Sequence, residues 1–179
     1  MIKSVSTIRG IIVLREANLA DVDQYRALRL FALRESPLAF GADYETSLNY
    51  PPEFWHERLQ DDENSVTFIA EHEQTLIGMM GISRRPLPKT KHSAKIIGVY
   101  VHPDWRGLRI AESLIDACIG WARSKEAVIV KLSVNAENTS AIRCYQRCGF
   151  TIYGTEPRGT FYNGKYYDGY LMYKALDGS

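Results

Sequence analysis

The spacing of apolar residues divides the chain into strands and helices. The clearest strand is residues 96–101, IIGVYV, which is rich in β-branched and aromatic residues and is soon followed by Pro103. From Arg109 to Ala122 the apolar residues recur three and four positions apart, which is the pattern of a helix with one face in a core. Residues 96–122 therefore predict a strand, a short turn and a helix.

The other elements follow from the same patterns. Strands are expected at residues 11–15, 66–71, 76–83, 128–134, 150–153 and 170–173, and helices at residues 18–36, 51–59 and from 138 onward. Asn18 is expected to cap the first helix, and Asn163-Gly164 to turn a C-terminal hairpin. The order β-α-α-β-β-β-α-β-α-β-β predicts an α/β fold, a mixed sheet with helices on both faces.

Length and composition indicate one ordinary globular domain over residues 1–179. Apolar residues make up 45% of the chain and charged residues 24%, and no apolar run approaches the roughly 20 residues that span a bilayer. A net charge of +1 argues against nucleic-acid binding. The N-terminus carries no signal-peptide pattern, so we expect a cytoplasmic protein with no membrane partner.

Three cysteines, Cys118, Cys144 and Cys148, are expected to stay reduced and to pack as small apolar side chains. Cys144 and Cys148 are four residues apart on a predicted helix and could share a metal ion. Closed zinc sites need four ligands at recognisable spacing, and no such set accompanies them. We therefore expect no metal.

The turn between the strand and the helix of residues 96–122 has the chemistry of an anion site. A helix N-terminus presents N–H groups without intrahelical partners, and Gly107 leaves room for close approach of a ligand. Arg106 and Arg109 add positive charge. The alternative is an ordinary strand-turn-helix corner whose arginines lie in solvent, and spacing alone does not separate the two.

Residues 99–111, VYVHPDWRGLRIA, resemble the acetyl-CoA motif of the GNAT superfamily of N-acetyltransferases. That motif is V-x-V-x-P-x-x-R-G followed by x-G-x-G/A. The valines, the proline, Arg106-Gly107 and the small Ala111 match it. Arg109 departs from it, because the family usually has glycine there.

A second segment, residues 138–150, resembles the family signature N-x-x-A-x-x-x-Y-x-x-x-G-F without a departure. The motifs, at about 96–122 and 128–150, imply one N-acetyltransferase domain. The resemblance implies a mostly antiparallel sheet in which strands 96–101 and 128–134 splay apart, with acetyl-CoA in the gap.

The resemblance also implies the site residues. Cofactor contacts are expected from Val99, Tyr100, Val101, Arg106, Gly107, Leu108, Arg109, Ile110, Ala111, Asn138 and Tyr145. A backbone N–H near Val99 to Val101 would bind the thioester carbonyl, and Tyr145 would protonate the departing thiolate. From spacing alone Tyr145 is a core tyrosine and Asn138 an N-cap.

The acceptor side is less defined. Residues 34–41 resemble the acceptor-side helix and loop of some bacterial GNAT enzymes, which implies that Arg34, Phe40 and Glu45 border the acceptor pocket. No motif fixes the general base; the candidates are Glu45, Glu71, Tyr100, His102 and Asp168.

Two functions are compatible with these features. The first is an N-acetyltransferase that moves an acetyl group from acetyl-CoA directly to a primary amine of a small molecule or of a protein or peptide N-terminus. The second is an acetyl-CoA-binding sensor with little turnover, which Arg109 makes conceivable. The aromatic C-terminal hairpin would either complete the sheet or pair across a homodimer.

Overall fold

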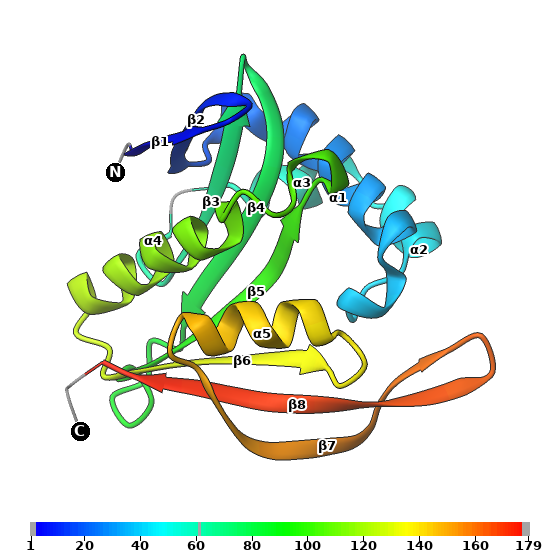
Figure 1. The fold of residues 1–179 in the computed structure, drawn as a ribbon, viewed down its shortest axis with the longest axis vertical. Coiled ribbons are helices and arrows are strands. Elements are labelled where there is room, and N and C mark those ends of the chain that lie inside the picture. The colour runs from blue at the N-terminus through cyan, green and yellow to red at the C-terminus, as the bar shows by residue number, and fades with distance from the viewer. Residues whose placement is uncertain (1–2, 61, 177–179) are drawn as a thin grey trace.

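The computed structural model describes residues 3–60 and 62–176, and these form one open, eight-stranded sheet flanked by helices (Figure 1). The strand order is β1-β2-β3-β4-β5-β6-β8-β7. Every neighbouring pair is antiparallel except β5 and β6, which are parallel. The predicted fold class, a mostly antiparallel α/β sheet with helices on both faces, is therefore confirmed.

The strands are β1 (Lys3–Thr7), β2 (Gly10–Glu16), β3 (Ser65–His72), β4 (Thr75–Arg84), β5 (Ser93–Val101), β6 (Ile129–Asn135), β7 (Thr151–Tyr162) and β8 (Lys165–Ala175). The helices are α1 (Val22–Glu35), α2 (Tyr44–Leu48), α3 (Pro52–Glu57), α4 (Ile110–Ser124) and α5 (Thr139–Arg147). Three short 3-10 turns are η1 (Leu19–Asp21), η2 (Pro37–Ala39) and η3 (Pro103–Trp105).

The two faces of the sheet build two hydrophobic cores. Successive residues of a strand point to opposite faces, and β3 illustrates this, because Phe68 and Ala70 join one core while Ile69 joins the other. The first core packs the apolar face of α4 against β3, β4 and β5 and extends to α5. The second packs α1 and α3 against the opposite face.

The sheet opens between β5 and β6. These strands pair over only three residue pairs, from Ser93↔Ile129 to Lys95↔Lys131, so their later halves separate. The register of β4 against β5 also shifts between Met79 and Gly81, and the facing Gly98 has φ +63°, a conformation that favours glycine. The predicted splayed strand pair is thus present.

Two elements were not predicted. Strand β1 pairs with β2, but its sequence KSVST has no apolar run to mark it. Helix α2 is only five residues long, and its start is marked by the Asp43 side chain, which accepts from the Thr46 N–H. Strands β7 and β8 are longer than expected and form the hairpin that extends past the helices in Figure 1. Within the described ranges, no helix has the length and apolarity to cross a membrane.

Candidate active site

The turn between β5 and α4 ends in a left-handed residue. After η3, Gly107 has φ +80° and Arg109, the N-cap of α4, has φ +57° and ψ +24°. The first turn of α4 has no side-chain cap at Arg109, so its N–H groups face outward without an intrahelical acceptor. This end of the helix can accept an anion.

A cavity of about 520 Å³ lies beside this turn. It is lined by β5, the β5–α4 turn, the first turn of α4, one face of α5, and residues just after α1. The lining residues are Ser36, Ala39, Val99, Tyr100, Val101, Trp105, Arg106, Gly107, Arg109, Ile110, Ala111, Glu112, Asn138, Ser140, Ala141, Cys144 and Arg147. All the predicted cofactor-binding residues are among them except Leu108 and Tyr145.

Arg106 is tied to the end of α1. Its Nη2 and Nη1 donate to the Glu35 carboxylate at 2.8 and 3.2 Å, and its Nε donates to the Val101 carbonyl at 3.1 Å. The Tyr100 hydroxyl donates to the same carboxylate at 3.2 Å, as does the Ser36 hydroxyl. Partial burial would raise the pKa of Glu35, but the bonds from Arg106 and Ser36 hold it below its ordinary value.

Arg109 is exposed, and within residues 3–60 and 62–176 no hydrogen bond or ion pair engages its side chain. Of these two cavity-lining arginines, Arg109 therefore has the guanidinium that is free to pair with an anion, whereas that of Arg106 is engaged by Glu35 and Val101. A third arginine was not anticipated. Arg147 of α5 lines the cavity and pairs with Glu112 of α4 at 2.6 Å. Its position at the end of the helix predicted to start at Asn138 was the available signal.

Of the two residues predicted at α5, Asn138 lines the cavity and Tyr145 does not. Asn138 lines the cavity and caps the helix, because its side chain accepts from the Ala141 N–H at 3.1 Å. Tyr145 lies behind the lining, 6% exposed, with its ring edge-on to Phe150. Burial raises the pKa of the Tyr145 phenol, so it stays protonated at neutral pH.

The predicted acceptor-side residues do not gather at the cavity. Phe40 is buried next to Tyr100, with ring centroids 6.4 Å apart. Arg34 and Glu45 are exposed, and the Arg34 guanidinium lies over the ring of Tyr44. None of these three residues lines the cavity.

The candidate general bases are mostly occupied elsewhere. Glu71 pairs with Arg15 at 2.6 Å, and Asp168 accepts from the Arg158 N–H at 2.8 Å. His102 stacks on Phe31, with ring centroids 5.0 Å apart. Tyr100 is the candidate that lines the cavity, but burial raises the pKa of its phenol, which therefore stays protonated at neutral pH.

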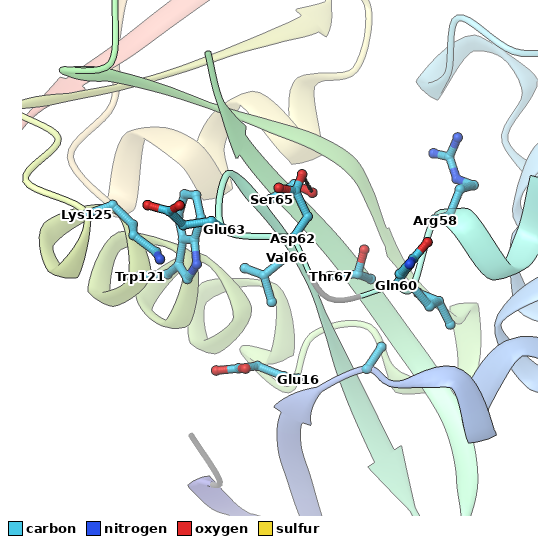
Figure 2. A pocket seen from close by; sticks show the side chains of 12 residues that line it. Glu16, Arg58, Gln60, Asp62, Glu63, Ser65, Val66, Thr67, Trp121 and Lys125 are labelled. Carbon is cyan, nitrogen blue, oxygen red and sulfur yellow. Dashed lines mark hydrogen bonds between the residues drawn. The ribbon is translucent and has the colours of Figure 1, made fainter. Parts of the chain in front are cut away.

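A second hollow, of about 440 Å³, lies at the opposite end of α4 (Figure 2). Figure 2 shows Trp121 and Lys125 on one side and Arg58 on the other. Asp62 lies between them, and its carboxylate accepts from the Ser65 hydroxyl and the Asn64 N–H, which fixes the turn before β3. The predicted cofactor-binding residues lie outside this hollow. Within the described ranges no group of three or more His, Cys, Asp or Glu side chains is arranged to hold a metal ion.

Comparison with known proteins identifies the family of this chain. The sequence model of the Acetyltransferase (GNAT) family matches residues 27–150. The L-amino acid N-acetyltransferase AaaT of Escherichia coli K12 is 30% identical over 66% of this chain and 73% of its own. The streptothricin acetyltransferase of Escherichia coli is 30% identical over 53% of this chain, which spans about half (52%) of that relative.

Solved structures share the fold. The GNAT-family acetyltransferase from Streptococcus pneumoniae superposes with a TM-score of 0.82 at 22% identity, over 92% of this chain and 99% of its own. The structure of yncA from Salmonella typhimurium, solved with its cofactor acetyl-CoA, gives a TM-score of 0.77 at 19% identity, over 94% and 95% of the two chains. On the match to its family model, this chain belongs to the GNAT family of N-acetyltransferases and is an acyltransferase.

Proposed function

We propose that the protein transfers an acetyl group from acetyl-CoA directly to a primary amine, carried by a small molecule or by a protein or peptide N-terminus. The observation that carries this proposal is the cavity beside the end of β5 that no longer pairs with β6, next to the uncapped first turn of α4 and the exposed Arg109. The name of the relative AaaT, an L-amino acid N-acetyltransferase, supports the small-molecule acceptor. The fold neighbour NAA60 of Arabidopsis thaliana was solved with a bisubstrate analogue.

The residues fit acetyl-CoA as a substrate. Its pyrophosphate would meet the N–H groups at residues 107–111 and the guanidinium of Arg109, since helix N-termini and arginines both stabilise phosphate. Asn138 and Ser140, on the opposite wall, offer polar groups to the pantetheine arm. Acetyl-CoA supplies the activated acetyl group.

The chain's own groups would promote the transfer in two ways. Backbone N–H groups at Val99 to Val101 would donate to the thioester carbonyl, and one such donor is typically worth about 2.7–4 kcal/mol to the transition state. Tyr145, whose burial keeps it protonated, would donate its proton to the departing thiolate. Glu45, Glu71 and Asp168, the candidate carboxylates, do not line the cavity, and the lining Glu112 is paired with Arg147. We therefore assign the removal of the proton from the acceptor amine to water.

The test is Tyr145→Phe. We expect thiol release from acetyl-CoA, measured with amino acids, polyamines, aminoglycosides and short peptides, to fall about a hundredfold with little change in acetyl-CoA affinity. Tyr153→Phe, an exposed tyrosine of β7, serves as the control and should retain the rate. An unchanged rate in Tyr145→Phe would contradict the assigned role. Acetyl-CoA binding with no thiol release in the presence of any acceptor would favour the sensor.

We further propose that the enzyme works in the cytoplasm. Its cysteines are free thiols, as expected in a reducing compartment. Cell fractionation tests this, because recovery in a membrane or secreted fraction would contradict it.

A further inference from the structure

Helix α1 holds an arginine on its buried face. Arg29 is 8% exposed, and its Nη1 is fully buried without a hydrogen-bond partner. Across residues 3–60 and 62–176, no carboxylate pairs with this guanidinium. A buried charge without a partner is strongly unfavourable, so its presence calls for a physical reason.

The surroundings of Arg29 leave its charge uncompensated. The guanidinium lies 4.1 Å from the centroid of the Phe40 ring, which offers a cation–π contact but no hydrogen bond. Burial lowers the pKa of Arg29, and its ionisable neighbours are the phenol of Tyr25 and a second cation, Arg58. Arg15 shows the contrast, because it is also partly buried but pairs with both Asp21 and Glu71.

Arg29 also lies directly behind the cavity wall. A Cβ placed on Gly98 would be 3.8 Å from Arg29 Nη1, so the guanidinium lies next to β5 at the register shift. Gly98 immediately precedes Val99, which lines the cavity. The Phe40 ring that covers Arg29 also lies next to the ring of Tyr100, another lining residue.

We propose that Arg29 binds the free carboxylate of the acceptor, and that the acceptor is an α-amino acid rather than a protein N-terminus. In an α-amino acid the carboxyl carbon is two bonds from the amine nitrogen. A carboxylate held at Arg29 therefore leaves the amine beside Gly98 and Val99, where the thioester is expected. A peptide N-terminus has an amide at that position and offers no such charge.

The enclosure of Nη1 sets the route of access. Phe40 follows η2 directly, in the irregular segment between η2 and α2, and its ring covers the guanidinium. Displacement of this ring would expose Arg29 to the acceptor. A bidentate arginine–carboxylate pair would then satisfy the buried charge. This inference rests on the acetyl transfer proposed above.

The test compares amino acids with their amides, which keep the amine and lose the carboxylate. The twenty standard L-amino acids and their L-amino acid amides would be assayed by thiol release, together with polyamines and short peptides. We expect the wild-type kcat/KM to be at least tenfold higher for the acid of each used pair. Arg29→Met should lower kcat/KM at least tenfold for the acids, mainly by raising KM, and less than threefold for the amides. Arg29→Lys should recover part of the lost kcat/KM for the acids.

Three results would overturn the inference. They are equal wild-type rates on acid and amide, an equal loss on both in Arg29→Met, and turnover confined to polyamines or peptides. In each of these the proposed acetyl transfer stands. If instead none of the tested acceptors supports thiol release, the proposed function fails and this inference fails with it.

The melting temperature of the ligand-free protein gives a second readout. Arg29→Met removes an unpaired buried charge at similar volume, so we expect melting several degrees above the wild type. Arg26→Met, one turn earlier on α1, is the control, because Arg26 is half-buried and donates to the Leu48 carbonyl at 3.4 Å; it should melt no higher than the wild type. A lower melting temperature for Arg29→Met would show a structural role and contradict the inference.

Discussion

Arg109 occupies a backbone conformation that favours glycine. Its φ of +57° and ψ of +24° place it in the left-handed region, which is costly for a side chain with a Cβ. The GNAT motif has glycine at this position, so the departure expected from the sequence has a structural counterpart. The protein accepts backbone strain here and gains an exposed guanidinium at the start of α4.

Arg109→Gly tests this strain. We expect it to raise the free energy of unfolding by about 0.5–1 kcal/mol, because glycine adopts this conformation without the Cβ penalty. Urea denaturation measures the change. Arg109→Ala is the matched control, since it removes the same charge but keeps the Cβ, and it should give little stabilisation. Equal stability of the Gly and Ala variants would contradict strain at this position.

Individual residues differed in how far the sequence predicted them. Asn138 as the cap of α5 followed from a short-range rule, and the structure has the bond. The pairing of Arg106 with Glu35 could not be foreseen, since the two residues are 71 positions apart. Arg29 left a signal, because it falls on the apolar stripe of α1 with Tyr25 and Leu33, where a cation is unusual.

At the element scale, one arginine of β2, Arg15, joins the start of α1 to strand β3. Asp21 is 5% exposed and accepts from both Nη atoms of Arg15 on β2 at 2.7 Å. Arg15 also pairs with Glu71 on β3. Asp21 further completes a capping box with Asn18, which caps the turn η1 that leads into α1 rather than α1 itself.

Asp21→Asn should therefore destabilise the fold by about 2 kcal/mol at pH 7, because it removes a charge-assisted pair. Its bonds to Arg15 hold the pKa of Asp21 below its ordinary value. A lowered pKa contributes stability that is complete above the ordinary value of roughly 3.9 and is lost as the pH falls through the folded value.

The difference in the free energy of unfolding between the wild type and Asp21→Asn should accordingly narrow as the pH falls below about 4. Urea denaturation at several pH values measures it, with the exposed Asp23→Asn as control. A gap that stays constant across this range would show that the charge of Asp21 is not the source.

Long periodic elements were predictable and short ones were not. The strand and helix expected at residues 96–122 are present as β5 and α4, because both periodicities run for many residues there. Strand β1 forms only because β2 offers it an edge, which is information outside its own five residues. The length of β7 and β8 likewise depends on their mutual pairing.

At the scale of the whole molecule, one break in a sheet organises the site. β5 and β6 separate after three residue pairs, and the cavity lies beside the turn that follows β5. Sequence periodicity gave the α/β class, whereas the splay came from the family resemblance. The position of α1 beside the cavity wall depends on how α1 and α3 pack in the second core. Local sequence patterns do not predict this packing.

The central claim is that this cavity binds acetyl-CoA through the turn before α4. Isothermal titration calorimetry of acetyl-CoA tests it with the double variant Arg106→Ala/Arg109→Ala, beside Arg123→Ala at the exposed far end of the same helix as control. We expect the double variant to bind at least tenfold more weakly, a loss of about 1.4 kcal/mol, while the control keeps the wild-type affinity. Unchanged affinity in the double variant would contradict the account.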